Sequence, residues 1–231
     1  AAYLAAAGAY RVGAGLVTVA VPSSIHGIVA PQLPEATWII LPSDMGVISG
    51  SGISIVHQTF ENVDSLLLGP GWGTERPTAD FMHGLLSFID DPTTGGIGFT
   101  IESGGKPIAE LDPDQLPPTV VDADGLRLLV ELPEWYLRLP ALSVLTPHPG
   151  EMAFLTGLSI DDVQSDRIGV ASHFASEWGH IVVLKGAYTV VSTPDSNVTV
   201  HPFATSALAC AGTGDVLAGL IAGLLAQGIQ P

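Results

Sequence analysis

The chain repeats one order of segments that limits what it can fold into: an apolar run, a polar or glycine-rich loop, and then a helical stretch. The loops are GPGWG (69–73), DAD (122–124), TPHPGE (146–151), LKG (184–186) and AGTGD (211–215). Strands that alternate with helices favour an α/β fold with a mostly parallel sheet. Open parallel sheets bind ligands at the carboxyl ends of their strands. We therefore expect these loops to gather at one edge of a sheet and to form a site there.

Apolar, β-branched runs predict strands, and apolar residues at 3.6-residue spacing predict helices. The expected strands cover 16–21, 37–41, 63–68, 119–121, 142–145 and 180–186, with a hairpin over 188–200. The expected helices cover 3–12, 78–89, 161–178 and a final stretch from Asp215 to a cap at Gly228. Gly219 and Gly223 inside this last helix indicate close packing against another element. Residues 91–118 are rich in Gly, Pro and Asp, and we expect a surface insertion there.

The length and composition favour one domain. Hydrophobic residues make up 47% of the 231 residues, which is enough for a large core. No internal repeat or linker divides the chain, so we expect a single domain over 1–231. The chain begins inside a predicted helix and stops just after the last one, so we expect this domain to be incomplete at both ends.

Charge and cysteine content exclude several classes of function. The formal net charge is −16 with only seven Lys and Arg, which argues against binding to a nucleic-acid backbone. The one cysteine, Cys210, cannot form an intramolecular disulfide, and this fits a reducing, cytoplasmic location. No apolar window has the length of a membrane span, and no basic segment marks a signal peptide. We expect a cytoplasmic protein that binds neither membranes nor nucleic acid.

The segment CAGTGDVLAGLIAGLLAQG (210–228) places one acid, Asp215, at the start of an apolar helix. Gly212, Thr213 and Gly214 leave backbone N–H groups at the positive end of the helix dipole, which is an anion site. The dipole is expected to lower the pKa of Asp215. Phosphoryl transfer tolerates such a weak base, because its transition state is loose. The alternative is that Thr213 or Asp215 only caps the helix.

The other loops carry candidate ligands for a phosphate or a metal. GPGWG lets a ligand approach the backbone, although alone it is a tight turn. In DAD one carboxylate could cap the next helix while the other faces a cation. The alternative is that one carboxylate caps the helix and the other is exposed to solvent. His148 and Glu151 of TPHPGE could both point inward, and Glu151 suits Mg²⁺ held through water. Lys185, one of two lysines, is a candidate partner for a nucleotide phosphate or else a surface cation.

Six segments, taken in order, resemble the ADP/ATP-dependent NAD(P)H-hydrate dehydratases of the ribokinase-like superfamily: RVGAGLVTVAVP, LLLGPGWG, VVDADGLRLL, LTPHPGEMAFLTG, VVLKGAYTVV and ALACAGTGDVLAGLIAGLLAQG. The resemblance runs from Arg11 to Gly228, apart from 91–118. It implies a three-layer ribokinase-like fold, in which helices flank a mostly parallel central sheet, and a homo-oligomer. It also implies ADP or ATP as phosphoryl donor and Mg²⁺ as cofactor. The substrate would be hydrated NADH or NADPH (NADHX or NADPHX), whose C6 hydroxyl is phosphorylated before phosphate is eliminated.

The resemblance also implies roles for individual residues. Asp215 would be the base that engages the substrate hydroxyl, beside an anion hole formed by Gly212, Thr213 and Gly214. The adenine nucleotide would lie along Lys185, Gly186, Ala187, Tyr188, Thr189 and Gly214. The hydrated dinucleotide would contact Gly71, Gly73, His148 and Asp215. Glu151 occupies the place of the glutamate that is associated with Mg²⁺ in the superfamily.

Two other functions fit the same residues. The Gly-x-Gly-Asp turn suits any ribokinase-like small-molecule kinase, including one for a vitamin precursor such as a hydroxymethylpyrimidine or thiazole alcohol. A non-catalytic nucleotide-binding module is the second alternative. A dehydrogenase is disfavoured, because the chain lacks the G-x-G-x-x-G fingerprint of dinucleotide-binding domains.

Overall fold

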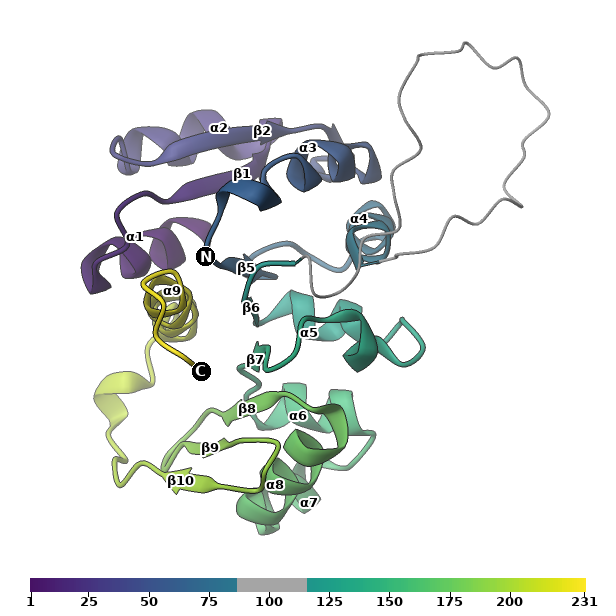
Figure 1. Cartoon of the computed structure of the whole chain (residues 1–231), viewed down its shortest axis with the longest axis vertical. Coiled ribbons are helices and arrows are strands. Elements are labelled where there is room, and N and C mark those ends of the chain that lie inside the picture. Colours follow the sequence, from purple (N-terminus) through teal and green to yellow (C-terminus); the bar gives the residue numbers. More distant parts are fainter. Residues whose placement is uncertain (87–115) are drawn as a thin grey trace, which may run out of the picture.

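The computed structural model describes residues 1–86 and 116–231 and is built around one central sheet (Figure 1). The sheet has six strands in the order β10-β9-β8-β7-β6-β5. Its strands are β5 (Leu66–Leu68), β6 (Thr119–Val121), β7 (Val144–Leu145), β8 (Ile181–Leu184), β9 (Val190–Ser192) and β10 (Val198–Val200). Strands β5 to β8 pair in parallel, whereas β9 and β10 pair in antiparallel fashion. The predicted mostly parallel sheet is confirmed.

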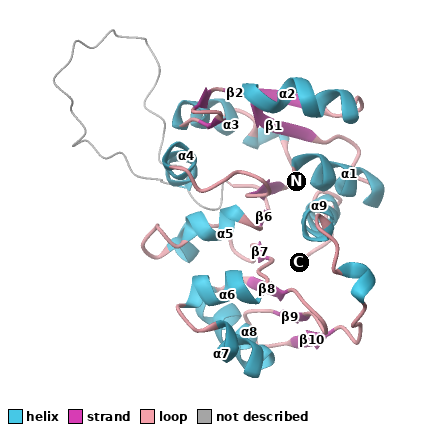
Figure 2. Ribbon diagram, turned by 180° about the vertical axis from the view of Figure 1, so that it is seen from behind, coloured by secondary structure: helices cyan, strands magenta, loops and turns pink. Residues whose placement is uncertain are grey.

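Helices cover both faces of this sheet (Figure 2). One face packs on α4 (Arg76–Leu86), α5 (Asp124–Leu129), α6 (Pro149–Thr156), α7 (Ile160–Ser165) and α8 (Arg167–Trp178). The other face packs on α9 (Thr213–Leu225). Neighbouring strand residues face opposite layers: Val121 contacts the first group of helices, and Val120 contacts α9. This arrangement gives the three layers that were expected.

Small residues let α1 (Ala2–Val12) lie very close to α9. A Cβ atom added to Gly219 would lie 2.0 Å from the carbonyl oxygen of Ala5, and one added to Gly223 would lie 3.0 Å from Cα of Ala9. The predicted close packing of these glycines is confirmed. It places the start of α9, with Asp215, against the start of α1.

The first part of the chain forms a smaller parallel pair of strands, β1 (Thr18–Pro22) and β2 (Thr37–Leu41). The pair packs on α1 and α2 (Ser23–Val29), and is followed by the hairpin β3 (Ser43–Asp44) and β4 (Val47–Ile48) and by α3 (Ile53–His57). Short 3-10 helices cover Ala30–Gln32, Gly50–Gly52, Phe60–Asn62, Trp135–Arg138 and Ser206–Leu208. No helix within residues 1–86 or 116–231 has both the length and the hydrophobicity needed to cross a membrane.

Two predictions about helices need correction. The helix expected over 161–178 is two helices, because the side chain of Asp166 accepts the Gly169 N–H and starts a new helix there. The sequence predicts a loop over TPHPGE, but α6 begins inside it at Pro149. Residues 91–115 of the predicted insertion over 91–118 lie outside the described residues. Residues 87–89 of the helix expected over 78–89 lie outside them too.

Candidate functional site

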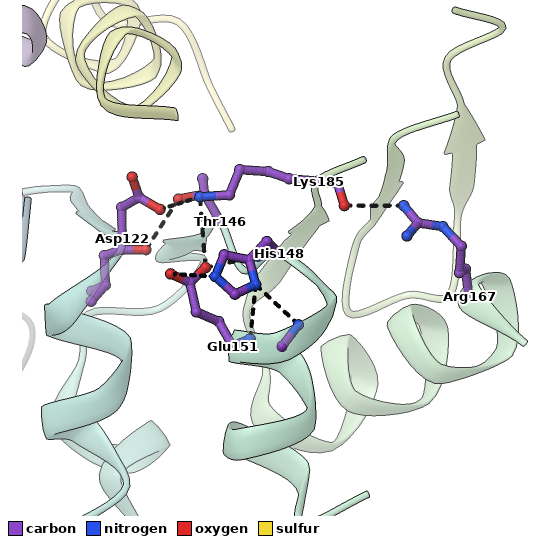
Figure 3. Close-up of polar contacts among 8 residues, drawn as sticks. Asp122, Thr146, His148, Glu151, Arg167 and Lys185 are labelled. Atoms are coloured by element: carbon purple, nitrogen blue, oxygen red, sulfur yellow. Dashed lines mark hydrogen bonds and ion pairs between the residues drawn. The ribbon is translucent and has the colours of Figure 1, made fainter. Parts of the chain in front are cut away.

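The loops after β6, β7 and β8 meet at one edge of the sheet, as expected for parallel neighbours (Figure 3). The ammonium group of Lys185 is at their centre. Its Nζ atom lies 2.6 Å from Oδ1 of Asp122 and 3.7 Å from Oε2 of Glu151. One cation therefore joins two carboxylates that are separated along the chain.

Asp122 is a residue that the sequence only partly identified. It is 1% exposed, and a buried carboxylate is stable only when a positive group or several hydrogen bonds compensate it. Lys185 provides that charge and is thus not a surface cation. The sequence signal was the DAD motif at a strand end, but the motif alone did not show which aspartate would meet a cation.

The second aspartate of the motif, Asp124, holds the GPGWG turn. One of its carboxylate oxygens accepts the backbone N–H of Gly73 at 2.9 Å. Neither aspartate caps α5, whose N-cap is Ala123 without a side-chain hydrogen bond, so the capping carboxylate that both interpretations of DAD included is wrong. Gly69 is needed for packing, since a Cβ atom there would lie 2.0 Å from the carbonyl oxygen of Asp122. Gly71 has a φ of 74° that favours glycine.

His148 and Glu151 form a capping box at the start of α6. The Nδ1 atom of His148 accepts the N–H groups of Gly150 and Glu151 at 3.0 and 3.1 Å, and Oε2 of Glu151 accepts the His148 N–H at 2.8 Å. A neutral His148 then carries its proton on Nε2, which lies 3.3 Å from Oε1 of Glu151. The H-P-x-E spacing, with proline at the first helical position, was a signal for this helix start.

Glu151 lies where a divalent cation could be held, although it cannot form a full coordination shell. Its side chain is 7% exposed, and both carboxylate oxygens already face His148. Within the described ranges, no group of three His, Cys, Asp or Glu residues could hold a metal ion. Asp122 and Glu151 fit Mg²⁺, which keeps several waters and takes further oxygens from phosphates.

Asp215 lies in the first turn of α9, and no side chain caps this helix. The hydroxyl of Thr213 instead donates to the carbonyl oxygens of Leu208 and Cys210 at 3.0 and 2.9 Å, so the capping alternative is wrong. The Thr213 N–H makes a long 3.4 Å bond to Cys210, and Gly212 adopts a left-handed conformation with a φ of 89°. This helix start therefore has no side-chain cap, and Gly214 in its first turn lies beside Lys185.

The pKa of Asp215 is raised, contrary to the expectation from the helix dipole. Burial is the main cause, the nearby carboxylate of Asp122 raises the pKa further, and the ammonium of Lys185 opposes this effect. The side chain is 19% exposed, which is consistent with burial as the main cause. A raised pKa makes Asp215 a better proton acceptor than the sequence predicted.

The start of α9 lies beside the other loops. A Cβ atom added to Gly214 would lie 3.4 Å from Nζ of Lys185 and 4.0 Å from Oδ2 of Asp122. Ala1 bridges to the GPGWG turn: its nitrogen lies 3.9 Å from Oδ2 of Asp215, and a Cβ atom on Gly71 would lie 2.8 Å from the Ala1 Cβ. The structure thus brings together the four segments that carry GPGWG, DAD, LKG and AGTGD.

The predicted nucleotide-binding segment 185–189 continues from Lys185 onto the surface. Gly186, Ala187 and Tyr188 are exposed, and the hydroxyl of Thr189 donates to the carbonyl oxygen of Gly186 at 2.9 Å. The ring of Tyr188 is open to solvent, and its backbone has a φ of 55°. The N–H of Tyr188 donates to the carbonyl oxygen of Phe203 at 2.9 Å, so this segment is held in place while the aromatic ring stays open to contact with a base.

Arg167 is a residue that sequence reasoning missed. Its guanidinium donates through Nη2 to the carbonyl oxygens of Leu184 and Lys185 at 2.9 and 3.3 Å (Figure 3). Arg167 therefore fixes the backbone at the end of β8, from which the Lys185 side chain projects. Nothing in the sequence indicates this role for Arg167, because Arg167 lies in α8 and its hydrogen-bond partners lie at the end of β8.

Comparison with known proteins gives three kinds of match. Residues 95–231 match the Carb_kinase family, which is described as NAD(P)H-hydrate dehydratase. The bifunctional NAD(P)H-hydrate repair enzyme Nnr of Moorella thermoacetica is 37% identical over 229 residues, 99% of this chain and 38% of that protein. The corresponding enzyme of Salinibacter ruber is 34% identical over 231 residues, again 99% of this chain and 38% of that protein. The chain thus spans about two fifths of the length of these relatives.

Solved structures agree with the fold. The ADP/ATP-dependent NAD(P)H-hydrate dehydratase from Bacillus subtilis, co-crystallized with ATP/Mg²⁺, is 26% identical with a TM-score of 0.67, over 97% of this chain and 67% of that chain. A ribokinase-like superfamily protein from Enterococcus faecalis is 22% identical with a TM-score of 0.72, over 97% of this chain and 66% of that chain. The second likeness concerns the fold alone, and it confirms the expected ribokinase-like architecture.

Proposed function

The chain belongs to the NAD(P)H-hydrate dehydratase family, and from that premise we propose that it repairs nicotinamide nucleotides. The reaction is the ADP- or ATP-dependent dehydration of (6S)-NAD(P)H hydrate to NAD(P)H. The C6 hydroxyl is phosphorylated first, because phosphate is a far better leaving group than hydroxide. Phosphate then leaves with help from the lone pair of the ring nitrogen, and loss of a proton from C5 forms the C5–C6 double bond of NAD(P)H. The observation that carries the proposal is the position of Asp215, at an uncapped helix start beside Lys185.

Asp215 acts as the base in this proposal. Its carboxylate orients the C6 hydroxyl and accepts its proton as the oxygen–phosphorus bond forms and the bond from that phosphorus to the nucleotide breaks. The raised pKa assists this step, since proton transfer is favoured when the base is not too weak. Backbone N–H groups of Gly212, Thr213 and Gly214 stabilise the negative oxygens of the transferred phosphoryl group.

The remaining loops bind the two nucleotides. Residues 185–189 border ADP or ATP, and Gly71, Gly73 and His148 contact the hydrated dinucleotide. Asp122 and Glu151 would hold Mg²⁺ through water, and the bound ion would neutralise phosphate charge. About half of the His148 side chain is exposed to a ligand, while Nδ1 is used by the helix cap and Nε2 faces Oε1 of Glu151.

Organisation and location are further parts of the proposal. Residues 1–231 belong to one ribokinase-like dehydratase domain, and the protein acts in the cytoplasm as a homo-oligomer on a small-molecule substrate. Strong net negative charge supports the expectation that nucleic acid is not a partner. The chain matches 38% of the length of two relatives that are called bifunctional, and this supports a place for this domain in a larger repair enzyme.

The test is to incubate the protein with hydrated NADH, ADP and Mg²⁺ and to follow the return of absorbance by the reduced ring. Asp215→Asn should lower turnover about a thousandfold, because a missing general base costs this order of rate. The affinity for ADP, measured by calorimetry, should change little. The exposed Asp161→Asn in α7 is the matched control and should retain full turnover.

Three outcomes separate the alternatives. If Asp215→Asn retains turnover, the assignment of the base is wrong. If the protein consumes ATP with a vitamin-precursor alcohol but not with hydrated NADH, it is a small-molecule kinase. If ADP binds and neither substrate reacts, the protein is a nucleotide-binding module.

A further inference from the structure

A lysine ammonium occupies the place in this site where a metal cation would be expected. Nζ of Lys185 lies 2.6 Å from Asp122 and 3.7 Å from Glu151, whose side chains are only 2% and 7% exposed. Two carboxylates that converge on one point in a dry environment are a cation site. In this structure the cation is part of the chain.

The surroundings make this ion pair more than a structural salt bridge. The ammonium also lies beside the start of α9, where a Cβ atom on Gly214 would be 3.4 Å away. A positive group at the N-terminal end of a helix is disfavoured by the helix dipole. The carboxylates therefore hold Lys185 at a location that suits an anion, and the attraction of the ammonium for that anion remains available.

We propose that the ammonium group of Lys185 is a placeholder for Mg²⁺. It occupies the carboxylate pair of Asp122 and Glu151 until a metal–nucleotide complex binds. Mg²⁺ with its waters then takes over the two carboxylates, and the released ammonium pairs with a phosphate oxygen at the start of α9. The identity of the nucleotide rests on the proposed function, whereas the exchange of one cation for another does not.

Charge explains why the exchange depends on the nucleotide. With Lys185 in place, the cluster of Asp122, Glu151 and Lys185 has one net negative charge, which attracts a free divalent cation weakly. The described residues also offer no third metal ligand of the His, Cys, Asp or Glu type. A phosphate both supplies further oxygen ligands and gives the displaced ammonium a partner, so metal and nucleotide bind together.

The experiment measures Mn²⁺ binding without nucleotide, by the electron paramagnetic resonance signal of free Mn²⁺. Lys185→Met removes the internal cation and keeps the length of the side chain, so its affinity for Mn²⁺ should rise about tenfold or more. Arg138→Met is the matched control, because it also removes one positive charge, from a partly exposed residue of the Trp135–Arg138 helix. Arg138→Met should bind Mn²⁺ like the unchanged protein. Equal or weaker binding by Lys185→Met would overturn the proposal.

Loss of Lys185 leaves Asp122 buried without a partner, so stability must be followed too. Mg²⁺ should raise the melting temperature of Lys185→Met but hardly that of the unchanged protein. If Lys185→Met is unfolded, added Mg²⁺ should restore cooperative unfolding, and failure to do so counts against the proposal. The double variant Asp122→Asn/Lys185→Met should lose the gained affinity for Mn²⁺, and retention of that affinity would contradict the assigned carboxylate.

These results are independent of the dehydratase assay, since no hydrated substrate is present. If Mn²⁺ binding follows the expectation and hydrated NADH does not react, only the proposed substrate is wrong. If hydrated NADH reacts and Lys185→Met shows no gain in Mn²⁺ affinity, only the placeholder role of Lys185 is wrong.

Discussion

A single methyl group added at Gly219 should disrupt the packing of α1 against α9. Gly219 of α9 faces the backbone of α1, and its substitution by alanine would place a Cβ atom 2.0 Å from the carbonyl oxygen of Ala5 and 2.6 Å from the Ala5 carbonyl carbon. Cβ atoms in proteins essentially never approach other atoms more closely than 3.0 Å, so the two helices must separate by about 1 Å. Both atoms belong to the backbone and cannot rotate away.

The magnitude follows from two opposed effects. Alanine in place of glycine within a helix stabilises it by about 1 kcal/mol. Forcing extra volume into a close-packed contact costs about 1–3 kcal/mol, and the upper end applies when backbone must move. We expect Gly219→Ala to lower the free energy of unfolding by about 2 kcal/mol, and to lower turnover as well, because Asp215 lies in the first turn of the same helix.

Urea unfolding followed by circular dichroism measures this free energy, and Gly27→Ala is the matched control. Gly27 lies inside α2, and a Cβ atom there would meet no atom within 4 Å. Gly27→Ala should therefore stabilise the protein by up to about 1 kcal/mol through helix propensity alone. The reasoning fails if Gly219→Ala is as stable as Gly27→Ala.

Three further perturbations address other parts of the structure. Burial lowers the pKa of His180, so its neutral form is favoured in the folded state. The contribution of neutral His180 to the free energy of unfolding is fully present above about pH 6.5, and it is lost as the pH falls through the lower folded pKa. His180→Phe should flatten this dependence in denaturation curves at several pH values, and an unchanged slope would exclude His180 as its source. Arg167→Met removes the donors to the carbonyl oxygen of Lys185, so hydrogen exchange in 184–189 should accelerate and the Kd for ADP should rise; exchange as slow as in the unchanged protein would contradict this bracing role. Asp124→Ala removes the acceptor of the Gly73 N–H, which should raise the KM for hydrated NADH severalfold with the KM for ADP unchanged; equal rises in steady-state assays would mean a general loss of structure.

Local patterns predicted most of the fold. The strands expected at 37–41 and 119–121 are β2 and β6 with the same bounds, because apolar, β-branched runs fit a buried sheet and little else. The parallel sheet followed from the helical stretches between the runs, since a crossover is required to bring the next strand alongside. The break at Asp166 was missed, because an apolar repeat continues on both sides of it and hides the cap.

The sequence predicted which segments form the candidate site, but it did not predict which side chains contact one another there. The loops at strand ends, the glycines and Asp215 were all found from their local patterns. The pairing of Asp122 with Lys185 was not, because these residues are 63 positions apart and meet only when β6 and β8 take their places in the sheet. Arg167 was missed for the same reason.

The sequence by itself determined the alternation of elements and the edge of the sheet at which the loops gather, since these depend on residues that are neighbours along the chain. Glycines inside the last helix indicated close packing, but only the structure showed that the partner is the backbone of α1. Only the tertiary structure decided which carboxylate of the DAD motif meets an ammonium, that His148 caps a helix through Nδ1, and that the pKa of Asp215 is raised rather than lowered. The physical reason is that desolvation and charge–charge interactions depend on distance in space and on burial, and packing sets both.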